Sequence, residues 1–332
     1  MKEIPIIFAC DDKFAIGLSL TLHSLLSSMD KNTFYNIYVL DGGISDKNKK
    51  KINRLKQFGN NRYSLSYIDM VNYSNEFKKI KLNNKRFSQS VFYRLLIPRL
   101  FKNKYDKVIF LDCDLIIDTD LSKLLEIDLG EMVFAGVPDI GIRYFYNTSK
   151  EKIRYYQAIG FNNKSILKYV NAGMMVWNLK EFSKHPEYLK ELRAFFFKHE
   201  ICYLNDQDAI NSIFYKRIKL LEPRWNLQIL WDNKESYKND LVYIYHFAGN
   251  KPWIQEVIPH LPFFPYYRMA SKYFPFSPWK FTIMFNTKIK FPIKLVYIKI
   301  TNKILKIISI LIPVKKTKSY IEKLIWRRIC PE

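Results

Sequence analysis

The chain has 332 residues, of which 48% are hydrophobic and 26% charged, so it can bury a sizeable core and is not a disordered protein. Its 54 lysines and arginines outnumber 31 acids and give a formal charge of +23, which favours a polyanionic partner such as a nucleic acid, an anionic membrane or a phosphorylated substrate. No apolar run reaches the length of about 18 residues that a membrane-spanning helix needs, and the four cysteines show neither metal-ligand nor disulfide spacing, which predicts a reduced, cytoplasmic protein.

The first third of the chain alternates short apolar runs with segments of helical periodicity. The apolar runs predict strands at 4–10, 34–40, 63–68 and 108–111, and the periodic segments predict helices at 18–29, 46–58 and 88–99. Ser45 is the expected N-cap of the second helix. This alternation predicts βαβ units around a parallel sheet.

Acidic residues follow two of these strands. Asp11 and Asp12 come after the first strand, and Asp112 and Asp114 come after the fourth. Ligands of open α/β sheets bind at the carboxyl ends of the strands, so we expect both pairs to belong to one site.

The middle of the chain carries further segments with polar interruptions. A strand is expected at 133–137, and the apolar segment 169–179 is interrupted by Asn171 and Gly173. The segment 204–215 opens with Asn-Asp-Gln-Asp and continues as a helix, and a short strand at 243–245 ends at His246. The character changes after Pro252, where prolines interrupt an aromatic stretch and residues 268–332 carry a net charge of about +13.

The Asp112-Cys113-Asp114 stretch places two carboxylates beside each other. Residues i and i+2 of an extended segment point the same way, so Asp112 and Asp114 converge while Cys113 points to the opposite side. Two buried carboxylates repel each other and need a cationic partner. A divalent metal suits carboxylate oxygen, whereas pairing with lysine or arginine side chains in a surface loop is the alternative.

A set of motifs occurs in order over residues 4–253. The motifs are FACDDKFAIGLSLTLHSLL, YVLDGGIS, YRLLIP, KVIFLDCDLII, YVNAGMMVWNL, LNDQDAIN, PRWNLQ and HFAGNKPW. Together they resemble the family 8 retaining glycosyltransferases, which include bacterial lipopolysaccharide glucosyl- and galactosyltransferases. The resemblance implies an α/β fold of the GT-A type, a single Rossmann-like nucleotide-sugar-binding domain over residues 1–260. Residues 261–280 resemble an extra segment of the lipopolysaccharide branch.

The resemblance also implies a metal site. Asp112, Asp114 and His246 match the family residues that bind Mn²⁺, which bridges the diphosphate of a UDP-sugar donor. Mixed oxygen and imidazole ligation favours Mn²⁺ over the alternative, Mg²⁺, which prefers oxygen ligands.

Further residues match donor-binding positions of the family. Asp11 matches the acid that recognises uracil, because a carboxylate accepts the imide N–H, whereas Asp12 is equally well explained as an N-cap of the following helix. Lys13 replaces an asparagine that often contacts the ribose. The remaining expected contacts to the donor are Arg94, Cys113, Asp139, Asn171, Ala172, Gly173, His246, Gly249 and Lys251.

The expected catalytic residues are Asp206, Gln207 and Lys251. Asp206 and Gln207 match the pair beneath the anomeric carbon of the donor sugar. A double displacement needs a carboxylate nucleophile, and Gln207 is a neutral amide. We therefore expect a same-face substitution in which the UDP leaving group assists deprotonation of the acceptor. Lys251 is expected to contact the diphosphate.

The basic C-terminal segment, residues 261–332, mixes apolar residues with lysine and arginine. Such a pattern predicts helices that lie peripherally on the anionic inner face of the cytoplasmic membrane, where a lipid-linked oligosaccharide acceptor is available. No motif of a nucleic-acid-binding fold accompanies the charge, so nucleic acid is not the expected partner. The leading hypothesis is transfer of glucose or galactose from a UDP-sugar to a lipopolysaccharide- or lipooligosaccharide-type glycan. The alternatives are a relative that glycosylates a protein or another glycan, and a non-catalytic module that binds nucleotide-sugars or membranes.

Overall fold

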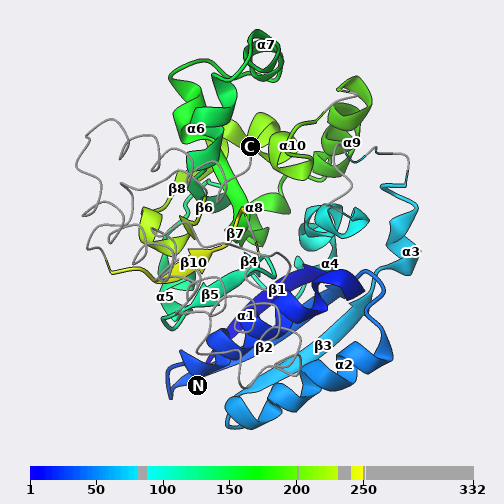
Figure 1. The fold of residues 1–332 in the computed structure, drawn as a ribbon, viewed down its shortest axis with the longest axis vertical. Helices are drawn as coiled ribbons and strands as arrows, with labels where there is room; N and C mark the ends of the chain where they lie inside the picture. The colour runs from blue at the N-terminus through cyan, green and yellow to red at the C-terminus, as the bar shows by residue number, and fades with distance from the viewer. Residues whose placement is uncertain are drawn as a thin grey trace, which may run out of the picture.

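Five of the predicted strands, at 4–10, 34–40, 63–68, 108–111 and 133–137, lie in one seven-stranded sheet, which β7 and β8 complete (Figure 1). The predicted strand at 243–245 belongs to a second sheet. The computed structural model describes residues 1–78, 80, 82, 88–199, 202–230, 241–249 and 251, so the expected membrane segment 261–332 lies outside the described residues. The strand order is β3-β2-β1-β4-β7-β6-β8. The strands are β1 Lys2–Cys10, β2 Thr33–Asp41, β3 Tyr63–Asp69, β4 Lys107–Leu111, β6 Phe134–Pro138, β7 Val170–Asn178 and β8 Ile218–Leu220.

The sheet is mostly parallel, as predicted, but β7 runs antiparallel to its neighbours. Strand β1 runs parallel to β2 and β4, but β7 runs antiparallel to both β4 and β6. Pro138 at the end of β6 pairs with Val170 at the start of β7, because the connecting residues 139–169 return the chain to the same edge of the sheet. Apolar periodicity identifies a buried strand but carries no information on its direction.

The two faces of the sheet pack against separate helical layers. Ile4, Ile6 and Phe8 of β1 share one core cluster with α1 (Ala15–Ser27), whereas Ile7 belongs to the cluster on the opposite face. Successive side chains of a strand point to opposite faces, so a strand covered on both sides is apolar throughout, as Ile4–Cys10 of β1 are.

The predicted helices form with local differences. Ser45 caps α2 (Asp46–Asn53) by accepting a hydrogen bond from Asn48 N–H, and the rest of the expected helix is the 3₁₀ segment η2 (Arg54–Phe58). The expected helix 88–99 is a 3₁₀ segment followed by a short α-helix. The other helices are η1 Asp12–Phe14, α3 Val71–Ser74, η3 Gln89–Leu96, α4 Ile97–Phe101, α5 Ser122–Glu126, α6 Ile140–Tyr146, α7 Lys150–Ala158, η4 Ser165–Lys168, α8 Leu179–Phe182, α9 Tyr188–Lys198, α10 Asp206–Phe214, η5 Tyr215–Arg217 and η6 Pro223–Trp225.

A second, three-stranded sheet lies beside the first. Its order is β5-β10-β9, and its strands are β5 Leu115–Ile117, β9 Leu227–Gln228 and β10 Ile244–His246. The Thr21 hydroxyl of α1 both donates to Leu115 C=O (3.0 Å) and accepts from Leu115 N–H (3.1 Å), so side chains of a helix satisfy the outer edge of β5. None of the helices in the described ranges has the length and apolarity that crossing a membrane requires.

Candidate active site

The segments after β1 and β4 and the start of β7 meet at one edge of the large sheet. Strands β1 and β4 are adjacent and parallel, with Ile6 opposite Ile109, so the acidic residues after both strands reach the same edge, as predicted. The start of β7 reaches this edge too, because β7 runs in the opposite direction. Asp112 N–H donates to Gly173 C=O at 2.8 Å and ties the segment after β4 to β7.

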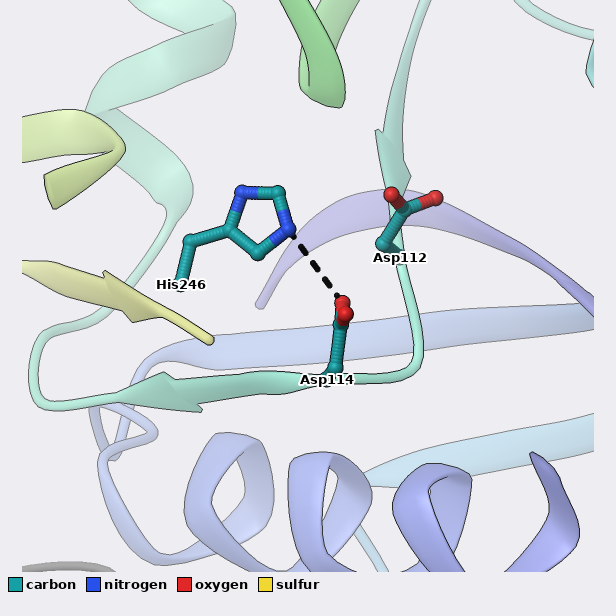
Figure 2. A group of neighbouring side chains, drawn as sticks. All are labelled: Asp112, Asp114 and His246. Atoms are coloured by element: carbon teal, nitrogen blue, oxygen red, sulfur yellow. Dashed lines mark ion pairs between the residues drawn. The ribbon is translucent and has the colours of Figure 1, made fainter. Parts of the chain in front are cut away.

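Asp112, Asp114 and His246 form a cluster at this edge. One ligand atom from each residue lies within 4.8 Å of the other two. Figure 2 shows the side chains converging, with the two aspartates on one segment and His246 opposite them. The small sheet is responsible for this arrangement, because its antiparallel pairing places His246 beside Leu115, and Phe247 N–H donates to Asp114 C=O at 3.0 Å.

The donor atoms of this cluster fit a divalent cation. Asp114 Oδ1 lies 3.3 Å from His246 Nε2, and this buried oxygen accepts no hydrogen bond from the residues that the structure describes. The other ring nitrogen, Nδ1, lies 2.9 Å from Asn226 Oδ1. Two carboxylates and an imidazole whose remaining nitrogen is hydrogen-bonded match the ligands and the supporting contacts of transition-metal sites.

Two cationic side chains contact the same acids. Arg94 NH2 lies 3.1 Å from Asp112 Oδ1, and Lys251 Nζ contacts Asp114 Oδ2 and Phe247 C=O, the latter at 2.6 Å. Burial raises the pKa of Asp112, and Arg94 opposes this only in part. Burial acts in the same direction on Asp114, but Lys251 and His246 outweigh it and hold the pKa below its usual range. Asp114 is therefore ionised and available as a ligand at neutral pH.

Arg94 connects this cluster to the start of α10. Its side chain is buried, and Nε lies 2.9 Å from Asp206 Oδ2 while a terminal nitrogen donates to Ala172 C=O at 2.5 Å. The guanidinium also lies 4.4 Å from the centre of the Phe110 ring. Burial raises the pKa of Asp206 to about 7 even though Arg94 opposes it, so this carboxyl group titrates near neutral pH.

Gln207 and Asn171 both bind Asp139. Each donates an amide N–H to Asp139 Oδ2 at 3.0 Å. The carbonyl oxygen of Gln207 accepts from Ala172 N–H at 2.9 Å, which fixes its amide at both ends. Asp139 Oδ1 accepts from Ile142 N–H at 2.9 Å and caps α6. Three of the roughly four lone-pair positions of the Asp139 carboxylate are therefore engaged within the protein.

The acids after β1 have separate roles. Asp11 is half-buried and caps η1 by accepting from Phe14 N–H at 3.0 Å, whereas Asp12 is exposed and accepts from Ser45 N–H at 2.8 Å. The capping role that the sequence suggested for Asp12 thus belongs to Asp11. Lys13 lies exposed on the same turn.

Three other expected donor contacts are occupied by the protein itself. The thiol of Cys113 points to Ala9 C=O at 3.4 Å, away from the two aspartates, and Gly249 N–H donates to Ile229 C=O at 3.4 Å. A Cβ atom on Gly173 would lie 2.3 Å from Cε1 of His246. The imidazole ring of His246 therefore packs directly against Gly173.

Two residues of the site had no role assigned from the sequence. Asn226 lies in the motif PRWNLQ and contacts His246. Asp208 is fully buried and accepts hydrogen bonds from Tyr169 OH (2.6 Å) and Tyr155 OH (2.9 Å), which anchors the start of α10. Both residues lie in motifs that the sequence analysis identified, but those motifs do not reveal their contacts, because their partners are distant along the chain.

Comparisons with known proteins agree on one family. The pattern described as Glycosyl transferase family 8 matches residues 5–256. General stress protein A of Bacillus subtilis (strain 168) is 28% identical over 270 residues, which cover 76% of this chain and 88% of that protein. A lipopolysaccharide 1,2-glucosyltransferase of Escherichia coli is 24% identical over 255 residues, with 73% of this chain and 71% of that protein covered.

Two solved structures share the fold. A structure of the bifunctional glycosyltransferase WbbM superposes with a TM-score of 0.70 at 28% identity and covers 86% of this chain, but the match spans only 52% of the WbbM chain. A structure of the galactosyltransferase LgtC with donor and acceptor sugar analogues gives a TM-score of 0.63 at 22% identity and covers 81% of this chain and 96% of that one. The GT-A expectation for the α/β domain is confirmed by these likenesses.

Proposed function

The chain belongs to glycosyl transferase family 8 and is a glycosyltransferase, and from this premise we propose that it transfers glucose or galactose from a UDP-sugar with retention of configuration. The cluster of Asp112, Asp114 and His246 beside Arg94 is the observation that carries the proposal. A divalent cation held by these three ligands, Mn²⁺ in our proposal, would supply positive charge to the diphosphate of the leaving nucleotide.

The roles of the donor-binding residues follow from their positions. Asp11 is at the edge of the site with a carboxylate that can accept the imide N–H of uracil, and Cys113 can contribute only backbone groups because its thiol points to the core. Lys251 carries its charge beside Asp114, and we assign its ammonium to the diphosphate of the donor. Asp139 keeps one lone pair for a sugar hydroxyl after its three internal hydrogen bonds.

The contacts around Gln207 and Asp206 support a same-face substitution. Gln207 is neutral and both ends of its amide are engaged, so it cannot form a covalent intermediate. Asp206 Oδ2 is directed to Arg94. We therefore propose that the acceptor oxygen forms its bond to the anomeric carbon on the face from which UDP departs, while the hydroxyl proton passes to a phosphate oxygen of the departing UDP. A covalent sugar adduct on Asp206, found by mass spectrometry, would contradict this pathway.

The acceptor that we propose is a lipopolysaccharide-type glycan at the inner membrane face. The support is the likeness to proteins named as lipopolysaccharide glucosyltransferases and the positive charge of residues 268–332. Co-sedimentation with vesicles that contain anionic lipids, compared between the full chain and a chain without residues 281–332, tests the membrane part. Equal sedimentation of the two proteins would remove the C-terminal segment from this role.

The proposed donor and metal are tested by release of UDP from a panel of UDP-sugars, with Mn²⁺ or with EDTA. We expect slow Mn²⁺-dependent release from one hexose donor and its loss in Asp114→Ala. Asp118→Ala is the matched control, because Asp118 is an exposed acid on the same segment and outside the cluster. A protein that neither releases UDP from any donor nor binds UDP in the presence of Mn²⁺ would refute the proposal.

A further inference from the structure

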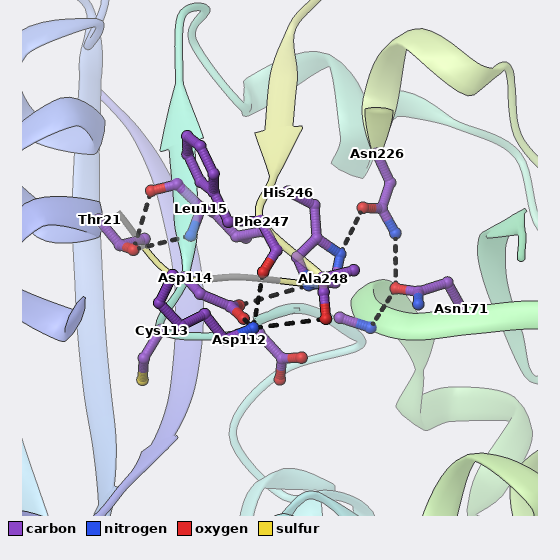
Figure 3. A network of polar contacts seen from close by, with 12 residues as sticks. Thr21, Asp112, Cys113, Asp114, Leu115, Asn171, Asn226, His246, Phe247 and Ala248 are labelled. Carbon is purple, nitrogen blue, oxygen red and sulfur yellow. Dashed lines mark hydrogen bonds and ion pairs between the residues drawn. The ribbon is translucent and has the colours of Figure 1, made fainter. Parts of the chain in front are cut away.

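A chain of buried side-chain amides joins Asp139 to His246. Asn226 Oδ1 lies 2.9 Å from His246 Nδ1, and Asn226 Nδ2 donates to Asn171 Oδ1 at 2.9 Å (Figure 3). Asn171 Nδ2 in turn donates to Asp139 Oδ2 at 3.0 Å. Asn226 is fully buried, and Asn171 and His246 are 7% and 3% exposed. Water therefore has little access to replace any of these contacts.

The orientation of each amide follows from the fixed ends of the chain. Asp139, as a carboxylate, only accepts, so Asn171 must present its NH₂ group there and its oxygen elsewhere. Gly173 N–H, which only donates, lies 2.9 Å from that oxygen and confirms the assignment. The second contact to Asn171 Oδ1 must then come from the NH₂ group of Asn226, which leaves the Asn226 oxygen to face His246.

An oxygen that faces Nδ1 requires a proton on Nδ1. The other nitrogen, Nε2, faces Asp114 Oδ1 at 3.3 Å, where a bound cation would accept its lone pair in place of a proton. We propose that Asn226 is a positioning residue that fixes the Nδ1–H tautomer of His246 and so presents Nε2 to a divalent cation shared with Asp112 and Asp114. This inference rests on the metal site of the proposed function.

The backbone around Asn226 holds its side chain in place. Asn226 follows η6, where its N–H donates to Pro223 C=O at 3.0 Å, and it precedes β9, which pairs with β10 through Leu227 and Tyr245. His246, at the end of β10, pairs with Gln228, so Asn226 lies two positions before the residue that is opposite His246 on the neighbouring strand. Gly173 also confines the imidazole ring, which packs so closely against it that an added Cβ would lie 2.3 Å from Cε1 of His246.

Two variants and one control separate this role from general packing. Asn226→Ala removes both contacts. Asn226→Asp keeps an acceptor for Nδ1–H but loses the donor to Asn171. Asn178→Ala is the matched control, because Asn178 is also a buried amide that donates to backbone carbonyls, Gly130 and Met132, at the far end of β7. Urea unfolding of all three proteins establishes that each is folded.

Two measurements that need no donor sugar test the proposal. Long-range ¹H–¹⁵N spectra of the metal-free protein report the tautomer of His246, and titration with Mn²⁺ followed by EPR reports the affinity. We expect a protonated Nδ1 in the wild type, loss of this preference and about 10–100-fold weaker Mn²⁺ binding in Asn226→Ala, and recovery of both properties in Asn226→Asp. Asn178→Ala should match the wild type in both.

The outcomes distinguish this inference from the proposed function. Asn226→Ala that keeps the wild-type tautomer and Mn²⁺ affinity would overturn the inference and leave the proposed function intact. A wild-type His246 that carries no proton on Nδ1 would also overturn it. A wild-type protein that binds no Mn²⁺ would refute the proposed metal site and, with it, the proposal that Asn226 positions His246 for a cation.

Discussion

Replacing Gly173 with alanine should displace His246 and weaken metal binding. The added Cβ would lie 2.3 Å from Cε1 and 2.9 Å from Nδ1 of the imidazole, whereas ordinary contacts begin at 3.4 Å. The Gly173 backbone cannot retreat, because its C=O accepts from Asp112 and its N–H donates to Asn171. The ring must therefore move by about 1 Å, which exceeds the tolerance of about 0.2 Å in metal–ligand distances.

This displacement should weaken Mn²⁺ binding by about 10–100-fold, and the overpacked site should cost about 1–3 kcal/mol of unfolding free energy. EPR titration measures the first quantity and urea unfolding the second. Gly136→Ala is the control, since its Cβ would lie 3.3 Å from Val170 Cβ on the neighbouring strand, an overlap that a shift of only a few tenths of an ångström relieves. Wild-type Mn²⁺ affinity in Gly173→Ala would show that His246 is not a ligand or that the ring is free to move.

Three further predictions concern the charged and hydroxyl groups around the site. Burial raises the pKa of Asp206 to about 7, so the native state retains a proton that the unfolded state releases, and stability falls as pH rises between about 4 and about 7. Between about pH 5 and about pH 8 the unfolding free energy of the metal-free wild type should fall by about 3 kcal/mol more than that of Asp206→Asn. Urea unfolding at each pH measures both proteins, and parallel pH profiles of their unfolding free energies would refute this prediction. Lys251→Ala should lower kcat for UDP release by about 100-fold without unfolding the protein, because it removes a preorganised cation beside Asp114. Unchanged turnover in this variant would exclude Lys251 from the site. Tyr169→Phe should lower the unfolding free energy by about 1.5–3 kcal/mol, because the hydrogen bond to the Asp208 carboxylate is lost. Tyr146→Phe is the control and should have little effect, since the buried Tyr146 hydroxyl has no hydrogen-bond partner in the described part of the chain. Equal losses of unfolding free energy in the two variants, measured with urea, would contradict this reasoning.

The large sheet could be predicted where its strands are buried on both faces. The run Ile4–Cys10 and the run Val108–Leu111 are apolar throughout, and each is a central strand in the structure. The position of the acids after these strands was enough to predict that Asp11 and Asp112 share an edge, because adjacent parallel strands end together.

The parts that escaped prediction depend on pairings between distant segments. Strand β5 has three residues, Leu115–Ile117, too few for a periodic signal, and it exists because β10 and α1 supply its partners. The direction of β7 depends on where the chain returns after residues 139–169. The contact of Asn226 with His246 likewise needs β9 and β10 side by side, so no local pattern could assign it.

The order of strands in the small sheet has a consequence for biosynthesis. β10 is the middle strand, so β5 and β9 have no common partner until residues 244–246 have left the ribosome. By then β8, the last strand of the large sheet in chain order, has already been made. Chains are synthesised from the N-terminus and domains fold as they emerge, so the nascent chain can complete its main core while His246 and Lys251 are still missing. Ligand binding at the cluster therefore marks a late stage of maturation, and a chain that ends before β10 would retain most of its sheet and lack the assembled site.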